Sequence, residues 1–295
     1  MISGIRLKEC PAEGEGVHRW IFHAACTLTD AGVSADSAAE IIEELMTRPP
    51  KPWSEVDDAL RSARGERKAG PRWTPAIPNC IVEVVKAGPS LAELISRSPQ
   101  PIHLGQPSHT EKYIDALFPG DPWLCVGRSD SDFYTTRRSL WRERLSDRAL
   151  IVPSPMSSQK GRTKQGKLSC HSEANTGPRR FLVVEFDSGS LDKQAALLWH
   201  LAQFAPLALV VFSGGKSAHS WFFCEGPAED KLTRFFDYAT SLGADPKTWS
   251  RSQFVRIPDG ERSDGKTGEG LSAAGVVGVP EGRQAVLYFN LEVIR

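Results

Sequence analysis

The stretch FLVVEFD, residues 181–187, is an apolar run that ends in two acids. Its Phe, Leu and Val side chains predict a buried β-strand over 181–186. Because residues two apart on a strand point to the same face, we expect Glu185 and Asp187 to present paired carboxylates at the C-terminal end of this strand. Such oxygen ligands suit Mg²⁺ or Mn²⁺. Two acids at a strand end can also simply face water, and this stretch alone leaves both interpretations open.

The residues after this strand continue a β-α-β pattern and lead to a glycine-containing loop. Apolar spacing predicts a helix over 191–204 and a second buried strand over 207–212. The stretch SGGKSAH, residues 213–219, then offers backbone amides, hydroxyls, an amine and an imidazole, a set of donors that suits a triphosphate. It is not a Walker A loop, since Val210 stands where that motif requires glycine. A Ser217–His219 nucleophile pair would need a third, orienting acid, and none is evident.

A third acid and two arginines follow further along the chain. Apolar spacing predicts a strand over 220–224 and a helix over 228–242, after which Asp245 precedes a proline. Arg251 and Arg256 come next. Asp259, in a turn-like Pro-Asp-Gly sequence, is a second candidate for the third acid.

Together these motifs resemble the catalytic core of the archaeo-eukaryotic primase (AEP) superfamily, in its plasmid and phage primase-polymerases. That superfamily carries an acidic pair at a strand end, a Ser-x-His on a following strand, a third acid beyond a helix and then a basic residue. Glu185 and Asp187 match the pair, although many relatives begin with Asp. Ser217-Ala218-His219 matches the second element, and Asp245 or Asp259 the third. The resemblance covers roughly residues 181–290.

The resemblance implies an α+β fold, with an RRM-like AEP catalytic core built on a mixed β-sheet with flanking helices. It implies a two-metal site for Mg²⁺ or Mn²⁺ on Glu185, Asp187 and Asp245, with His219 as a further catalytic residue. The phosphates of an incoming NTP or dNTP would be bound by Ser213, Gly215, Lys216, Ser217, His219 and Arg256. The implied activity is that of a DNA primase/polymerase, a nucleotidyltransferase that extends a 3′-hydroxyl on a single-stranded DNA template. Two alternatives are a catalytically weak replication initiator or nucleic-acid-binding module of the same fold, and a metal-dependent nuclease or phosphoesterase.

A basic stretch precedes the acidic strand. Residues 157–180 hold six cations against one acid, Glu173, with few apolar residues, and this composition predicts a mobile loop. Cations beside an acidic metal site suit a nucleic-acid backbone, and an exposed, unspecific loop is the alternative. The residues expected to contact nucleic acid are Lys160, Arg162, Lys164, Lys167, Arg179, Arg180 and Arg251. A predicted helix over 139–145 carries further arginines that could contact phosphate but that we interpret as a solvated helix face, namely Arg137, Arg138, Arg142 and Arg144.

The chain before residue 111 divides into a helical unit and a linker. Apolar residues at helical spacing between 16 and 64, interrupted by Pro49, Pro50 and Pro52, predict a small all-α three-helix domain over 1–65. It resembles the primase C-terminal (PriCT) domain, although here it comes first, and a generic helical bundle is the alternative. Pro, Gly and basic residues predict a linker and irregular segment over 66–110, within which a helix is expected over 90–96. The AEP-like catalytic domain would occupy 111–295.

Composition limits the remaining function classes. Lys+Arg and Asp+Glu both total 36, so contact with nucleic acid requires a local basic patch. No apolar stretch approaches the ~20 residues of a membrane span and no signal peptide is evident, so we expect a cytoplasmic protein with no membrane partner. The cysteines form no CxxC pair and Cys170-His171 has no second ligand pair, so no zinc site is predicted. No helicase sequence follows the core before Arg295, and the resemblance implies a separate replicative helicase as a partner.

Overall fold

The structure is a computed structural model that describes residues 7–50, 55–64, 73–104, 109–262, 271, 274, 276, 278–280 and 282–294. The chain divides into two compact units, Met1–Pro71 and Arg72–Arg295. The first is helical and the second contains helices and β-sheets, so the expected α+β class is confirmed. No helix in the described part of the chain is both long and apolar enough to cross a bilayer.

The described part of the first unit contains three helices, as expected for residues 1–65. They are α1 (Val17–Asp30), α2 (Ala35–Leu45) and α3 (Glu55–Ala63). Helix α2 begins after Ser34, whose hydroxyl accepts a hydrogen bond from the Ser37 amide at 3.3 Å. Apolar side chains at helical spacing form the core of the unit, and Glu55 is buried beside it, paired with Arg48 at 2.8 Å and with His18 at 2.9 Å. These pairs compensate the charge that burial would otherwise make unfavourable.

The second unit is built on a four-stranded sheet in the order β10-β7-β8-β6. Its strands are β6 (Phe181–Glu185), β7 (Leu207–Phe212), β8 (Ala218–Phe223) and β10 (Val286–Phe289). Helix α7 (Leu191–Leu201) connects β6 to β7, but β8 lies between these two strands and pairs antiparallel with both. Strand β10 is antiparallel to β7. All pairings among the described strands are therefore antiparallel, and the expectation of a mixed sheet was wrong.

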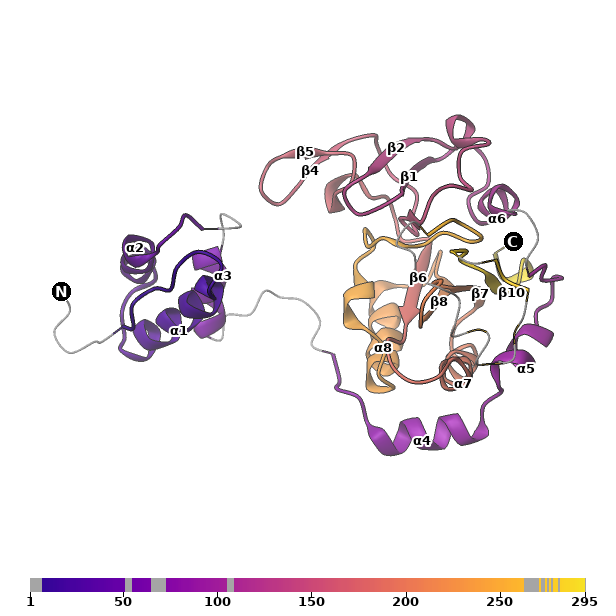
Figure 1. Ribbon diagram of the computed structural model, residues 1–295, viewed down its shortest axis with the longest axis horizontal. Coiled ribbons are helices and arrows are strands. Elements are labelled where there is room, and N and C mark those ends of the chain that lie inside the picture. Colours follow the sequence, from indigo (N-terminus) through magenta and orange to yellow (C-terminus); the bar gives the residue numbers. More distant parts are fainter. Residues whose placement is uncertain are drawn as a thin grey trace. The chain divides into compact units, whose positions relative to one another are not determined.

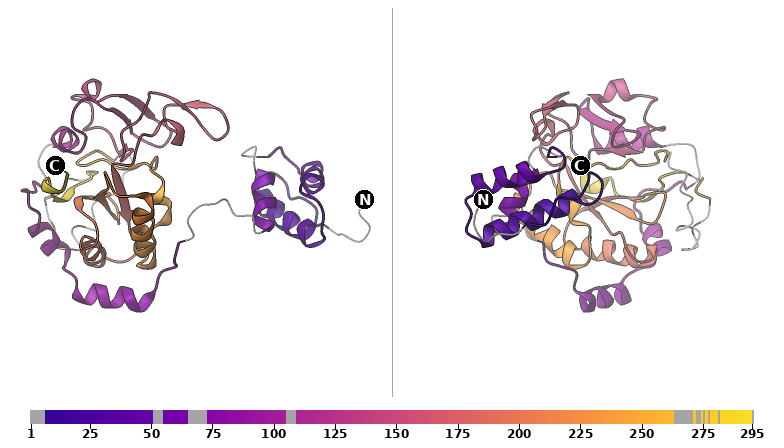
Figure 2. Two further views of the ribbon diagram at one scale, coloured as in Figure 1. Left: turned by 180° about the vertical axis from the view of Figure 1, so that it is seen from behind. Right: turned by 60° about the vertical axis from the view of Figure 1, so that its left-hand side comes forward.

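The central sheet is covered on both faces, as Figure 1 and Figure 2 show. Leu182 and Val184 of β6 pack with α7 and with α8 (Glu229–Ser241). Phe181 and Val183 face the other way and pack with α6 (Thr110–Leu117) and a second sheet. That sheet has the order β2-β1-β3-β9 and consists of β1 (Trp123–Gly127), β2 (Phe133–Arg137), β3 (Leu150–Ile151) and β9 (Val255–Arg256). Burial on both faces explains why β6 is continuously apolar.

The segment 66–110, in which we expected a linker, irregular structure and one helix over 90–96, contains two helices among its described residues. Helices α4 (Pro78–Ala87) and α5 (Leu91–Ser96) occupy part of 66–110 and pack against α7. Leu91 and Leu94 are buried in the same core as α7, so this part of the chain belongs to the second unit. A capping box of Ser90 and Glu93 begins α5. We had predicted that the second domain begins at residue 111. It also includes residues 73–104, so the predicted start was too far along the chain.

Two expectations between residues 138 and 180 were also wrong. The predicted helix over 139–145 is only a short 3₁₀ turn, η1 (Arg138–Trp141). The expected mobile loop over 157–180 contains a hairpin of β4 (Gly161–Arg162) and β5 (Leu168–Ser169), followed by η2 (Glu173–Asn175). Side-chain hydrogen bonds to the backbone, which composition does not reveal, organise this segment.

Candidate functional site

Three segments of the central sheet meet at one end: the last residue of β6, the loop between β7 and β8, and the first residues of β8. Glu185 lies directly opposite His219 in the β6–β8 pairing. The β7–β8 loop is closed by a hydrogen bond from the Ser213 amide to the Ser217 carbonyl at 2.8 Å. Gly214 has a φ of 80°, a left-handed conformation that glycine adopts without strain. The strand register thus places the acidic motif beside the Ser-x-His motif.

The Glu185 carboxylate contacts two side chains of that motif. Its Oε1 accepts a hydrogen bond from the Ser217 hydroxyl at 2.7 Å and lies 3.3 Å from His219 Nε2. Burial raises the pKa of Glu185, but the His219 charge and the hydrogen bonds from His219 and Ser217 outweigh it and lower the pKa to about 2. His219 Nδ1 is buried and has no hydrogen-bond partner within the described ranges. The contact with His219 thus favours the ionised form of Glu185.

Asp187 lies two residues beyond Glu185 and is exposed. Partial burial and then the Glu185 charge raise the pKa of Asp187; Lys216 lowers it and Asp245 raises it further. Three acids and one lysine are thus within electrostatic reach of one another. Because the pKa of Glu185 is lowered and that of Asp187 is raised, a proton binds to Asp187 first.

The two carboxylates fit a divalent cation that is shared with a substrate. Two adjacent carboxylates repel each other unless a proton or a cation lies between them. Mg²⁺ is often held by only one or two carboxylates, with substrate phosphates and water as its other ligands. Among the described residues, no group of three His, Cys, Asp or Glu side chains is arranged to hold a metal. The donor set therefore fits an open, two-carboxylate site and not a closed cage.

Asp245 is the third acid beside this pair. Its amide donates a hydrogen bond to the Glu185 carbonyl at 2.9 Å, so the chain at Asp245 runs along the edge of β6. Its Oδ1 accepts a hydrogen bond from the Lys247 amide at 3.0 Å and caps η3 (Pro246–Trp249). Asp245 thus combines a capping role with a position from which its charge acts on Asp187.

Asp259, the other candidate for the third acid, joins different elements. Its carboxylate accepts hydrogen bonds from the amides of Val286 at 3.2 Å and His109 at 3.4 Å. Burial raises its pKa, and these two bonds act against that change. Asp259 therefore links the start of β10 to the start of α6, and the geometry favours Asp245 as the acid of the site.

Backbone amides of the β7–β8 loop converge on one oxygen atom. The amides of Gly215 and Ser217 lie 3.4 Å and 3.3 Å from the Ser213 hydroxyl, to which they donate. Convergent amides of this kind are typical of anion-binding loops. The Lys216 side chain is exposed beside them. Because these amides donate to Ser213 and the Ser217 hydroxyl donates to Glu185, Lys216 is the group of this loop that is placed to meet a phosphate.

Two residues outside the predicted motifs hold this loop. Gln194 of α7 is fully buried; its Nε2 donates to the Lys216 carbonyl at 2.9 Å and its Oε1 accepts from the Ala218 amide at 2.9 Å. Arg262 Nη1 donates to the Ser213 carbonyl at 2.7 Å. The only sequence signal for Gln194 was a polar residue within the otherwise apolar face of a predicted helix.

We expect Glu185→Gln to destabilise the protein by about 2 kcal/mol at pH 7, because Ser217 and His219 lose a charged acceptor. The folded pKa of Glu185, about 2, is below the ordinary value of 4.5. Its stabilising contribution is therefore complete above about pH 4.5 and is lost as the pH falls toward 2. Urea titrations between neutral and acidic pH should show the difference between wild type and variant shrinking. A difference that does not change with pH would contradict this assignment.

Replacing Gln194 with Met should destabilise the protein by about 2 kcal/mol, because the Lys216 carbonyl and the Ala218 amide would be buried without partners. Gln203→Met is a matched control, since Gln203 is exposed just beyond α7. The control is expected to unfold within about 0.5 kcal/mol of wild type. Equal losses in the two variants, measured by chemical denaturation, would show that the Gln194 bonds contribute little.

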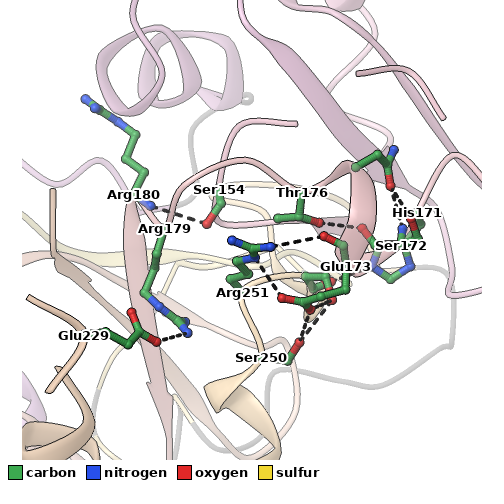
Figure 3. Close-up of polar contacts among 12 residues, drawn as sticks. Ser154, His171, Ser172, Glu173, Thr176, Arg179, Arg180, Glu229, Ser250 and Arg251 are labelled. Carbon is green, nitrogen blue, oxygen red and sulfur yellow. Dashed lines mark hydrogen bonds and ion pairs between the residues drawn. The ribbon is translucent and has the colours of Figure 1, made fainter. Parts of the chain in front are cut away.

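Three of the arginines expected to contact nucleic acid form ion pairs within the protein, and Figure 3 shows those of Arg179 and Arg251. Their carboxylate partners are Glu229 for Arg179, Glu225 for Arg180 and Glu173 for Arg251. The Arg179 guanidinium also lies 4.5 Å from the centre of the Trp249 ring. Arg256, expected to bind nucleotide, lies on β9 in the second sheet, opposite Leu150. The structure thus brings together the acidic, serine and histidine motifs, and places these arginines in other contacts.

Comparisons with known proteins gave no relative from which a function could be transferred. No protein-family model matches the chain, and neither curated proteins nor solved structures gave a significant match. The function is therefore inferred from the chemistry of the site.

Proposed function

We propose that the chain is a metal-dependent nucleotidyltransferase of the primase-polymerase type, which transfers nucleotides to a 3′-hydroxyl on a single-stranded DNA template. The observation that carries this proposal is the contact of Glu185 with Ser217 and His219, next to Asp187. The acidic pair, the Ser-x-His and the third acid therefore lie close together, as a common active site requires, whereas Arg256 lies on β9. The split β-α-β arrangement of β6, α7 and β7, with β8 inserted, is also compatible with an RRM-like core.

In this proposal Glu185 and Asp187 would hold a Mg²⁺ or Mn²⁺ ion, and Asp245 would be a third ligand. When bound, the ion would neutralise negative charge on the triphosphate and on the pyrophosphate product. Lys216, whose charge already acts on Asp187, attracts the phosphates to the β7–β8 loop. His219 keeps Glu185 ionised and oriented. These residues position charge, which is the main task of the protein in phosphoryl transfer.

A nucleic-acid-binding module of the same fold, with weak or no catalysis, is the second candidate. One observation favours it: the described residues contain no ready group of three metal-binding side chains. In addition, one oxygen of Glu185 is already engaged by Ser217 and His219. In either case the N-terminal helices would form a PriCT-like accessory domain. The two candidates differ in whether nucleotides are incorporated.

Incorporation of labelled NTP or dNTP on a single-stranded DNA template, with and without a primer, tests the proposal. We expect products with Mg²⁺ or Mn²⁺ and none after chelation of the metal. No product from a protein that still binds the template would overturn the proposal in favour of the binding module. Shortening of the template would instead indicate a metal-dependent nuclease.

A further inference from the structure

The hairpin of β4 and β5 carries a cluster of exposed positive charges. Lys160, Arg162, Lys164 and Lys167 lie on the hairpin or next to its strands, and all four are exposed. Within the described ranges none of the four forms an ion pair with a carboxylate. The Arg162 guanidinium donates a hydrogen bond to the Gly166 carbonyl at 3.0 Å, which closes the turn of the hairpin. These charges are therefore available to an anionic partner.

An exposed aromatic ring lies beside the base of this hairpin. Tyr134, on the edge strand β2, is 46% exposed. Its hydroxyl oxygen lies 2.6 Å from the Nε2 of Gln159, which donates to it and directly precedes Lys160 in the chain. This bond fixes the ring next to the cations. An exposed ring beside a row of cations is typical of surfaces that bind single-stranded nucleic acid, because bases stack on the ring while phosphates contact the cations.

The hairpin is anchored to the second sheet, so the ring and the cations are held in a fixed arrangement. The Thr135 hydroxyl donates to the Cys170 carbonyl at 2.7 Å, which ties the end of the hairpin to β2. Asn175 Nδ2 donates to the carbonyls of Cys170 at 3.0 Å and Ser158 at 3.2 Å, one on each side of the hairpin. Glu173 attaches the same segment to the loop after η3 (Figure 3). Anchoring of this kind reduces the entropy that binding would cost.

We propose that the β4–β5 hairpin and Tyr134 together form the surface that holds the single-stranded template. The inference rests on the proposed function and specifies it, because it assigns the template to four cations and one ring. It excludes Arg179, Arg180 and Arg251, whose charges are compensated within the protein. Duplex DNA fits this surface less well: its bases are stacked on one another, and each strand of the hairpin has only two paired residues with which to enter a groove.

The charges are tested by fluorescence anisotropy with the full chain, a labelled oligo(dT) of about 16 nucleotides and no metal or NTP. Each phosphate contact contributes about 0.7 to the slope of log affinity against log salt, so replacing three lysines of the hairpin should lower that slope by about 2. The triple variant changes Lys160, Lys164 and Lys167 to Ala. A matched control changes Lys86, Lys112 and Lys231, three exposed lysines elsewhere in the same unit, and should leave the slope unchanged.

The ring is tested by Tyr134→Ala, which we expect to weaken binding of the oligonucleotide about tenfold. Tyr134→Phe keeps the stacking surface but loses the bond to Gln159, so its affinity should fall between those of Tyr134→Ala and wild type. Tyr238→Ala is the matched control, since Tyr238 is also an exposed tyrosine held by a hydrogen bond, to His200 at 2.6 Å. Thermal unfolding midpoints close to that of wild type would show that each variant is folded.

The outcomes separate this inference from the proposed catalysis. The assay contains neither metal nor NTP, so a variant that lacks Asp187 should bind the oligonucleotide like wild type. If the hairpin variant and Tyr134→Ala bind the single strand as tightly as wild type, the inference is overturned, even if the protein incorporates nucleotides. Equal loss of binding to a duplex of the same length would overturn it too. If both variants lose single-strand binding but no nucleotide is incorporated, the surface is supported and the proposed catalysis fails.

Discussion

Asp187→Asn is expected to reduce nucleotide incorporation at least about 100-fold while the protein stays folded. Asp187 is exposed beside Glu185, so it is the carboxylate of the pair that a substrate-bound cation can reach directly. Asparagine keeps the size of the side chain and removes its charge. The loss should appear in the rate of incorporation at saturating template, because the template surface that we infer does not include Asp187.

The same substitution should make the folded protein slightly more stable at pH 7. Partial burial and the Glu185 charge raise the pKa of Asp187, so its ionised form opposes folding above its ordinary pKa. Solvent screening limits this effect, and we expect a gain of up to about 0.5 kcal/mol. The gain should vanish as the pH falls and Asp187 is protonated in wild type. In a site that binds a cation, the two carboxylates repel each other until the cation is bound. Removing one of them should therefore lower activity and raise stability.

Asp230→Asn provides the control for this experiment. Asp230 is an exposed acid on α8 that pairs with Arg234 at 3.0 Å, one helical turn away. Its removal should leave incorporation unchanged. Mn²⁺ should raise the thermal unfolding midpoint of wild type and of Asp230→Asn, but not that of Asp187→Asn. Wild-type incorporation by Asp187→Asn would remove Asp187 from the site.

Strong local signals made the elements around the site predictable. Strand β6 is an uninterrupted apolar run, and α7 and α8 each repeat apolar residues at helical spacing. Their predicted and observed bounds differ by only a few residues. The contact of Glu185 with Ser217 and His219 also involves only residues that the motifs had selected. These helices, this strand and this contact could be predicted because each depends on a short, continuous stretch of sequence.

Features that depend on pairing between distant segments could not be predicted in this way. Strands β3 and β9 have two residues each, too few for an alternating pattern to be visible. The order of elements did not reveal that β8 inserts between β6 and β7, and the mixed sheet implied by the resemblance was wrong. Gln194 is one polar residue in a helix, and only the fold shows that it is buried against the β7–β8 loop.

Arg138 shows most clearly how burial changes the meaning of a charged residue. Both Arg138 and Arg142 were interpreted as solvated, yet the Arg138 side chain is completely buried while that of Arg142 is 61% exposed. Both pair with acids of α6: Arg138 with Glu111 and Asp115, and Arg142 with Asp115. Arg138 Nε lies 2.9 Å from Asp115 Oδ1, although the two groups are not aligned as in a hydrogen bond. Arg138 therefore joins η1 to α6 from within the protein.

We expect Arg138→Ala to lower the free energy of unfolding by about 3 kcal/mol and Arg142→Ala by less than about 0.5 kcal/mol. The first change removes a buried stem and leaves Glu111 and Asp115 without their shared partner, whereas the second breaks a 3.4 Å pair that water screens. Chemical denaturation in low salt and in about 1 M salt distinguishes the two, because ions screen the exposed pair but not the buried one. Similar losses of stability in both variants would mean that the charge of an arginine near α6 matters, and that its burial does not. A large loss confined to Arg138→Ala would establish that this arginine is part of the core.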